Sequence, residues 1–272
     1  MNFNISVLFA ALRTYSRNKK GRKFEPEIPF LKEILSKGEN CLHIGASDAR
    51  HSYVMSKLIE NGQIYAFEPS SYSYNHLVLM TKLHRLKNIH TYNYAVSNEA
   101  GTVSLVTPQK STGHAGRSFA FITGTDNLNA DRKDIQSSSS TTEDVQAVSV
   151  DGFVSDNKLK HIDFIRCDTE GSEMLILKGA SDTIEKYKPS LLIEIHSDAL
   201  KTVFNSSASE VTDYLFSLGY HMFREDDGQI HHVSAVDEAE NWKDYFFIHN
   251  ARAHDLPEGS FRSQLEQLEK AS

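Results

Sequence analysis

The sequence predicts an α/β fold built around one mostly parallel sheet. Short apolar runs with the composition of strands alternate with helical patterns along most of the chain, and this order is typical of a parallel sheet covered by helices. The run 162–167 is apolar, ends in acids and leads directly into a helical pattern, as a buried parallel strand does. The last two strand-like runs, 221–223 and 244–249, are joined by a polar connection without a helical pattern. They predict an antiparallel hairpin that closes the sheet.

Length and cysteine content are those of a globular α/β protein. A chain of 272 residues suffices for one large domain with additions, or for two small ones. No stretch reaches the roughly 18 consecutive apolar residues of a membrane span. Both cysteines, Cys41 and Cys167, fall inside predicted strands. We therefore expect buried thiols in a reducing compartment, not a disulfide or a metal site.

Charge is distributed unevenly along the chain. Residues 1–23 contain six basic and no acidic side chains, and since the whole chain carries −7, the remainder carries −13. An acidic body argues against nucleic acid as a partner. The apolar residues of 5–12 precede the positive charges, which is the reverse of the order in a secretory signal. We expect a cytoplasmic protein whose basic arm could make peripheral contact with the inner membrane surface; a solvated tail is the alternative.

The first elements are a basic arm and a helix, which we assign to 1–37. Residues 24–37 carry apolar side chains at helical spacing behind two prolines, a pattern that predicts a helix. The strand 41–46 then begins the main domain, which we expect to span 38–250. Gly45 is the only glycine in the turn after this strand, whereas a dinucleotide site uses three.

An acid ends the second predicted strand, 63–68. Glu68 follows Gly45 by 23 positions and precedes Pro69. This separation is close to the roughly 20 residues at which an acid binds the hydroxyls of a ribose. A carboxylate can accept hydrogen bonds from both hydroxyls, so we assign Glu68 to a ribose. The alternative is an acid at the start of a helix.

A long insertion follows the third predicted strand. Residues 107–143 are rich in Ser, Thr, Gly and Asn, and they separate two strand-like runs, 101–106 and 144–150. Runs of this length inside a compact domain are usually disordered or functional. We expect an inserted substrate lid, with a passive insertion as the alternative. The side chains expected to contact a polar substrate are His114, Arg117 and Ser118.

Acidic side chains also end two later strands. Asp168 follows the run 162–167, and the run 190–196 contains Glu194 and His196. Side chains two positions apart on a strand share a face, so Glu194 and His196 should point the same way. Neighbouring strands lie about 4.8 Å apart, so the acidic ends should converge. Asp168 could instead cap the helix that follows it.

The closing hairpin brings the number of predicted strands in the main sheet to seven. A dinucleotide-binding fold would keep alternating strand and helix at this point, so the ending separates the two architectures. Residues 251–272 contain a further helical pattern, which we expect to form a peripheral C-terminal helix.

The central motif resembles that of a known enzyme family. The segment 163–180 contains Asp168-x-Glu170-Gly171-x-Glu173 and then Leu177-Lys178-Gly179-Ala180, and it resembles the signature of the FkbM-type methyltransferases. The resemblance extends over about 40–250. It implies a Rossmann-like class I methyltransferase fold with a seven-stranded sheet and S-adenosylmethionine (SAM) as cofactor. In that family an acid usually stands at the position of His43, and a glycine at that of Ala49.

The resemblance also implies where the cofactor binds. Contacts are expected from the turn after the first strand, from the ends of the second and third strands and from the central motif. The third strand, 89–96, lacks the acid that many such enzymes use for adenine, so the backbone near Ala95 or the side chain of Asn93 would replace it. The expected cofactor-binding residues are His43, Gly45, Ala46, Ser47, Glu68, Pro69, Ala95 and Asp168.

Characterised family members O-methylate sugars or natural products, so the resemblance implies a small-molecule or glycan acceptor. A sugar hydroxyl is not ionised at neutral pH and therefore requires a base or a metal. We assign His196 as the base, with Asp168 as the alternative base or its partner. Glu194 lies beside them in the sequence pattern, and Glu170 is assigned to the substrate. The alternative is Mg²⁺ held by Asp168, Glu194 and His196.

Two other functions stay open at this point. One is a non-catalytic SAM-binding protein on the same fold, which is conceivable because His43 and Ala49 depart from the family pattern. The other is a nucleotide-dependent enzyme such as a dehydrogenase, against which the single glycine and the hairpin ending count. The identity of the acceptor and the oligomeric state do not follow from the sequence.

Overall fold

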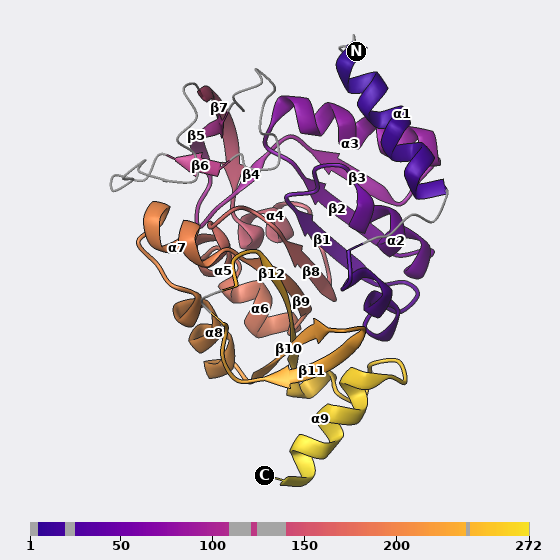
Figure 1. Cartoon of the computed structure of the whole chain (residues 1–272), viewed down its shortest axis with the longest axis vertical. Coiled ribbons are helices and arrows are strands. Elements are labelled where there is room, and N and C mark those ends of the chain that lie inside the picture. Colours follow the sequence, from indigo (N-terminus) through magenta and orange to yellow (C-terminus); the bar gives the residue numbers. More distant parts are fainter. Residues whose placement is uncertain (1–4, 20–24, 109–120, 124–139, 238–239, 272) are drawn as a thin grey trace.

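The computed structural model describes residues 5–19, 25–108, 121–123, 140–237 and 240–271. Its main element is an eight-stranded sheet with the strand order β11-β10-β12-β9-β8-β1-β2-β3 (Figure 1). The strands are β1 (Asn40–Ile44), β2 (Gln63–Phe67), β3 (Ile89–Tyr92), β8 (Phe164–Cys167), β9 (Ser190–Ile195), β10 (Tyr220–Asp226), β11 (Gln229–Val233) and β12 (Lys243–His249).

The directions of the strands confirm the predicted sheet. The strands β3, β2, β1, β8 and β9 pair in parallel, and β12 runs antiparallel to both β9 and β10. The sheet has one strand more than predicted, because part of the polar connection forms β11 and pairs with β10. Asp227 and Gly228 join them with φ angles of 49° and 79°. This Asp-Gly dipeptide is the sequence signal that predicts the extra hairpin.

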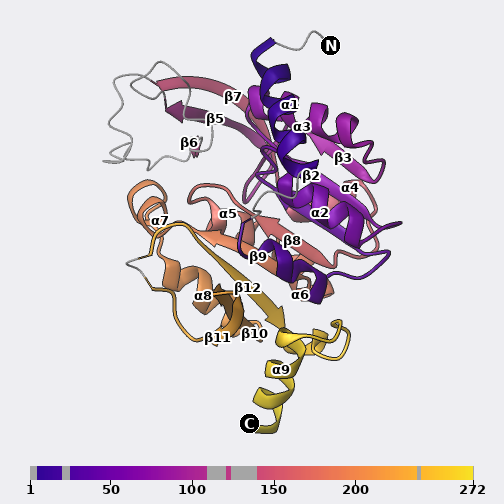
Figure 2. The same cartoon turned by 45° about the vertical axis from the view of Figure 1, so that its right-hand side comes forward.

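Helices cover both faces of the sheet, so the fold has three layers (Figures 1 and 2). The helices are α1 (Ile5–Lys19), α2 (Arg50–Leu58), α3 (Ser71–His84), α4 (Val150–Asp156), α5 (Glu173–Lys178), α6 (Ser181–Tyr187), α7 (Ser197–Val203), α8 (Ala208–Ser217) and α9 (Ser260–Ala271), with short 3-10 helices η1 (Ile28–Glu33) and η4 (Asn250–Arg252). One apolar core joins the sheet to α1, α2, α3 and α9, and the other joins it to α4 through α8.

Successive side chains along each strand contribute to the two apolar cores in turn. Cys41 belongs to the first core and Leu42, its neighbour in β1, to the second, because successive side chains of a strand point to opposite faces. Cys41 and Cys167 are buried free thiols, as predicted. None of the described helices is long and apolar enough to cross a membrane.

The N-terminal segment differs from the prediction in its helices. Residues predicted as one helix over 24–37 form only the short η1, which has a proline at its start. The helix α1 instead lies within the predicted basic arm and packs against α3. The reason is that Ile28 and Leu31 are already buried by the short 3-10 helix, so the apolar spacing is satisfied without a longer helix.

A second, four-stranded sheet lies beside the main one. Its order is β4 (Ala95–Val96), β7 (Ser140–Val148), β5 (Gly101–Pro108) and β6 (Phe121–Thr123). The third predicted strand is therefore split, since β3 stays in the main sheet and β4 pairs with β7. Within the predicted lid, 107–143, the described parts continue β5, form β6 and begin β7. Its role as a lid stays a prediction.

The edge of the main sheet at β11 is covered by the C-terminal helix. The Gln264 amide of α9 donates to the carbonyl oxygen of Ile230 at 2.8 Å and accepts from the backbone N–H of His232 at 2.9 Å. Exposed edges offer unpaired backbone groups to other chains, and here one side chain pairs with two of them. The predicted C-terminal helix thus stabilises the added strand.

The turn after β1 depends on the absence of a side chain at Gly45. Its φ is 80°, and an added Cβ would lie 1.8 Å from the carbonyl oxygen of Asp168. Left-handed φ angles are strained for residues with a side chain. Gly45 therefore allows the ends of β1 and β8 to approach closely.

We predict that Gly45→Ala lowers the free energy of unfolding by about 2–4 kcal/mol, because it combines backbone strain with a steric clash. Chemical denaturation measures the change. Gly101→Ala is the matched control, since a Cβ there has no neighbour within 4 Å, and we expect it to change stability by less than about 0.5 kcal/mol. Equal stability of the two variants would contradict the close approach.

Candidate active site

A cavity of about 370 Å³ opens where the carboxyl ends of β1, β2, β8 and β9 meet. Its size lies within the roughly 300–1,000 Å³ of small-molecule sites. An apolar wall comes from both sheets and consists of Phe67, Val96, Leu105 and Ile122. The position of the cavity is that expected of ligand sites in open α/β sheets.

Most of the residues predicted for the site line this cavity. They are His43, Gly45, Ala46, Ser47, Glu68, Pro69, Ala95, Asp168, Glu170 and Glu194. His196 is not among the lining residues. The predicted substrate contacts His114, Arg117 and Ser118 lie outside the residues that the structure describes. Their roles stay predictions.

Glu68 is held at the end of β2 by backbone donors. Its Oε2 accepts from the N–H of Ser47 at 2.9 Å, and its Oε1 accepts from the N–H of Ser70 at 3.0 Å. Burial raises the pKa of Glu68 to about 7, although these two hydrogen bonds lower it. Asn93 donates to the carbonyl oxygens of Glu68 and Pro69, so its side chain fixes this loop.

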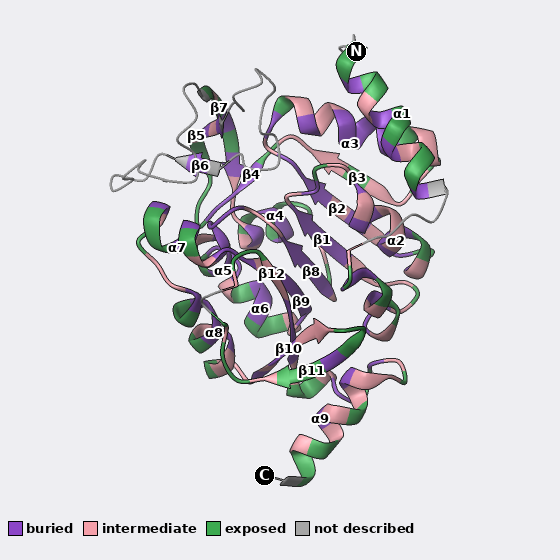
Figure 3. Cartoon of the chain, in the orientation of Figure 1, coloured by how far each residue is buried: buried purple, intermediate pink, exposed green. Residues whose placement is uncertain are grey.

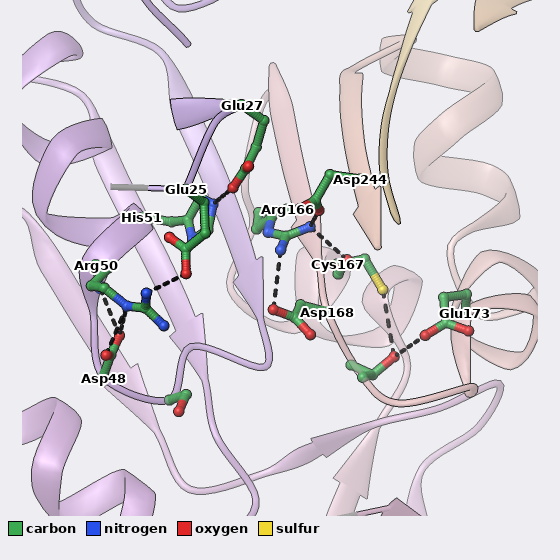
Figure 4. A network of polar contacts seen from close by, with 12 residues as sticks. Glu25, Glu27, Asp48, Arg50, His51, Arg166, Cys167, Asp168, Glu173 and Asp244 are labelled. Carbon is green, nitrogen blue, oxygen red and sulfur yellow. Dashed lines mark hydrogen bonds and ion pairs between the residues drawn. The ribbon is translucent and has the colours of Figure 1, made fainter. Parts of the chain in front are cut away.

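Arg166 forms ion pairs with two acidic side chains, Asp168 and Asp244 (Figure 4). Its guanidinium side chain is 2% exposed and lies 3.0 Å from Asp168 Oδ2 and 2.6 Å from Asp244 Oδ1. Burial lowers the pKa of Arg166, but the charges of Asp244 and Asp168 outweigh it and leave the pKa above its ordinary value. Burial raises the pKa of Asp244 to about 6. The Arg166 ion pairs orient Asp168 at the cavity.

Asp168 and Glu194 converge, as their positions on β8 and β9 predict. The pKa of Glu194 is raised to about 10, first by burial, then by the charge of Asp168 and a hydrogen bond between the two side chains. The raised pKa favours the neutral form of Glu194, in which its carboxyl group donates to Asp168. The helix-cap alternative for Asp168 is wrong, because Ser172 is the N-cap residue of α5.

His196 lies beneath an aromatic ring and not at the cavity surface. It is 2% exposed, and its ring stacks on Trp242 with centroids 4.9 Å apart. Its Nδ1 lies 3.7 Å from Glu170 Oε2. The strand β9 ends at Ile195 and His196 is the N-cap residue of α7, so the alternation that predicts a shared face with Glu194 does not reach it.

Comparison with known proteins identifies the family. A sequence model of the methyltransferase FkbM domain matches residues 43–222, which is more than half of the chain. The chain belongs to the FkbM methyltransferase family. Members of this family are SAM-dependent, and the matched segment contains the turn after β1, Glu68 and the central motif. No curated protein sequence matches the chain.

Several solved structures resemble the FkbM-family chain. A methyltransferase FkbM from Methylobacillus flagellatus KT is 16% identical, with a TM-score of 0.49, over 79% of this chain and 44% of that one. A SAM-dependent methyltransferase from Aquifex aeolicus is 15% identical (TM-score 0.43, 86% and 98% covered). A Streptococcus mutans protein in complex with S-adenosylhomocysteine (SAH) is 10% identical (TM-score 0.45, 82% and 96% covered). The chain spans less than half of the Methylobacillus protein.

Two residues that depart from the FkbM pattern, Ala49 and His43, lie at the turn after β1 and within β1. Ala49 has a φ of 64°, a left-handed conformation that glycine adopts without strain and that is strained for a residue with a side chain. His43 Nδ1 lies 2.6 Å from Ser52 Oγ. Burial is the first cause that holds the pKa of His43 well below its ordinary value, and the ring is neutral.

A cluster of polar residues at the cavity was not found from the sequence. His51 Nε2 lies 2.8 Å from Glu27 Oε1, and Glu25 pairs with Arg50 (Figure 4). Burial lowers the pKa of His51 to about 4, so its ring is neutral. Because Glu25 and Glu27 precede β1 and have no local motif, only the tertiary fold reveals that Glu25 lines the cavity and that Glu27 bonds to the lining residue His51.

The structure gives no support to the Mg²⁺ alternative. His196 does not line the cavity with Asp168 and Glu194. Within the described ranges, the three residues whose potential ligand atoms lie within 4.8 Å of one another are Glu25, Glu27 and His51. Glu27 and His51 already bond each other there.

The protonated state of Glu194 predicts a pH dependence of stability. Between an ordinary pKa near 4.5 and the folded value of about 10, the folded state binds one proton more than the unfolded state. Stability should therefore fall as pH rises through this window, by up to about 1.4 kcal/mol per pH unit. Glu194→Gln keeps a neutral hydrogen-bonding group, so its thermal midpoint relative to the parent should rise steadily from pH 5 to pH 9.

The exposed Glu99→Gln provides the matched control, and its midpoint should keep a constant offset from the parent over the same range. If the offset of Glu194→Gln were equally constant, Glu194 would be ionised in the folded protein and the assignment would be wrong.

Proposed function

We propose that this chain transfers a methyl group from SAM to a hydroxyl group of a sugar, a glycan or a related natural product. The observation that carries the proposal is the arrangement of acids in one cavity. Glu68 lies at the end of β2, and the pair Asp168 and Glu194 lies at the ends of β8 and β9. One acid is thus available for a ribose, and a separate pair for proton transfer from an acceptor.

The residues at the cavity suit SAM. Glu68 is oriented by two backbone N–H groups, and each carboxylate oxygen retains a lone pair for a ribose hydroxyl. The apolar wall with Phe67, Val96 and Leu105 suits an adenine ring, and the turn at Gly45 permits close approach of the backbone. When bound, SAM supplies an electrophilic methyl group on a sulfonium sulfur.

We assign the role of base to Asp168. Its side chain is 33% exposed and is held on one side by Arg166, while neutral Glu194 donates to it. A carboxylate in these contacts is a weak base towards a free alcohol. As the new bond to the acceptor oxygen forms, however, the hydroxyl proton becomes acidic and can pass to Asp168. Arg166 and Glu194 act as positioning residues that fix the direction of the carboxylate.

The position of Trp242 supports the proposal that the acceptor contains a ring. It lines the cavity, is 46% exposed and is braced from behind by the ring of His196. A flat aromatic face of this kind suits the apolar C–H face of a sugar ring, with the sugar hydroxyls directed towards polar groups. His196 would then act through Trp242 instead of touching the acceptor.

Replacement of Glu68 tests the cofactor half of the proposal. Glu68→Gln should weaken SAH binding by about 1–3 kcal/mol, roughly 5- to 150-fold in Kd, because one of the two acceptor oxygens for the ribose hydroxyls is replaced by a donor. Isothermal titration measures the affinity. Glu99→Gln is the control, since Glu99 is exposed and lies outside the cavity lining. Equal affinities of both variants and the parent would contradict the role of Glu68.

Replacement of Asp168 and His196 tests the base. Transfer of labelled methyl from SAM is first measured on a panel of monosaccharide glycosides. Asp168→Asn should then lower kcat by about 10²–10⁴-fold, whereas His196→Phe, which keeps a flat ring beneath Trp242, should change kcat less than about tenfold. Thermal midpoints check that both variants fold. The reverse order of kcat values would make His196 the base, and a panel without any transfer would count against a sugar acceptor.

A further inference from the structure

The helix α1 exposes an unusual set of apolar side chains. Ile5, Leu8, Phe9 and Leu12 are 71%, 42%, 69% and 44% exposed, and their spacing places them on one face of the helix. We call them the α1 apolar stripe. The other large apolar side chains that are exposed in the described part of the chain are Tyr94 and Trp242, which line the cavity.

The stripe is not the face through which α1 joins the fold. Val7, Ala11, Thr14 and Asn18 are buried, and they follow one another at helical spacing on a different side. The helix α1 lies against α3 (Figures 1 and 2), and Val7 and Ala11 belong to the same apolar core as Leu77 of α3. Exposed segments alternate with buried ones along α1 (Figure 3). Contiguous exposed apolar surface of this kind marks an interaction site.

The charge of the segment identifies the kind of partner. One row along α1, at intervals of four residues, consists of Ile5, Phe9, Arg13 and Arg17. The α1 apolar stripe therefore continues directly into two exposed arginines. Residues 1–23 contain six basic and no acidic side chains, whereas the rest of the chain is strongly acidic. A partner that suits both features presents apolar groups beneath a layer of negative charge.

We propose that α1 binds the surface of an anionic lipid bilayer, with the α1 apolar stripe inserted among the acyl chains and the basic side chains at the headgroups. Amphipathic helices with this pattern lie in the plane of the membrane, and each basic residue near the surface adds to the attraction. At 1.5 Å per residue, the 15 residues of α1 extend about 22 Å. The proposal is independent of the methyl-transfer reaction.

A second copy of the chain is a less suitable occupant of the stripe. Symmetric dimers bring the same surface of both subunits together, which would place Arg13 and Arg17 of one copy near the same residues of the other. The acidic body of another copy offers charge but not an apolar layer, because its exposed large apolar residues outside α1 are confined to the cavity among the described residues.

Vesicle sedimentation of the full chain tests the proposal. The parent should pellet with vesicles of phosphatidylcholine and phosphatidylglycerol, and far less with phosphatidylcholine alone. Ile5→Ser/Phe9→Ser should reduce the partition coefficient at least tenfold, because two inserted side chains are lost. Arg13→Glu/Arg17→Glu should reduce it at least tenfold as well. Lys160→Glu/Lys201→Glu, an equal change of charge at exposed positions outside α1, should retain most of the binding.

Circular dichroism and thermal midpoints establish that all variants fold, which is expected because the altered side chains are exposed. The proposal is overturned if the parent does not sediment with anionic vesicles, or if the serine variant binds as well as the parent. It is also overturned if the parent is a dimer by light scattering and the serine variant a monomer, since the stripe would then bind a second copy.

Discussion

The buried charge of Arg166 is the constraint on which the sheet and the site both depend. A buried ion without partners costs several kcal/mol, and the charge of Arg166 is balanced by ion pairs with Asp168 and Asp244. Asp244 lies on β12, and β9 separates that strand from β8. The ion pair therefore reaches across a strand and ties the antiparallel ending to the parallel half of the sheet. The same contact fixes the carboxylate of Asp168 at the cavity.

Burial, together with the charges around Arg166, explains why Glu194 retains its proton. Glu194 is paired in register with Asp244 on one side and bonds Asp168 on the other. Three carboxyl groups surrounding one guanidinium would leave excess negative charge in a buried region, and like charges raise the pKa of one member. Glu194 is that member, so the site contains a hydrogen-bond donor where the sequence shows an acid. The protonation state follows from neighbours on other strands.

Features with a local pattern were predicted from the sequence, and features that depend on element boundaries were not. Glu68, Asp168 and Glu194 were found because a strand that ends in an acid is visible within six residues, and parallel strands bring their ends together. His196 was misplaced because its predicted face assumed that β9 extends one residue further. The predicted helix over 24–37 failed for a similar reason, since apolar spacing alone does not distinguish a long helix from a short turn with the same buried residues.

Contacts between segments far apart in the chain could not be predicted from the sequence. They bear on His43, one of the two positions that depart from the FkbM pattern. Arg166 and Asp244 are 78 residues apart, and no local motif links them. His43 is paired in register with Arg166 and stands where the family usually has an acid. With Asp168 and Asp244 already bonded to Arg166, a further acid at that position would add to the excess of negative charge that Glu194 relieves by its proton. A neutral His43, bonded to Ser52, adds none. The departure is therefore consistent with the charge balance of this site.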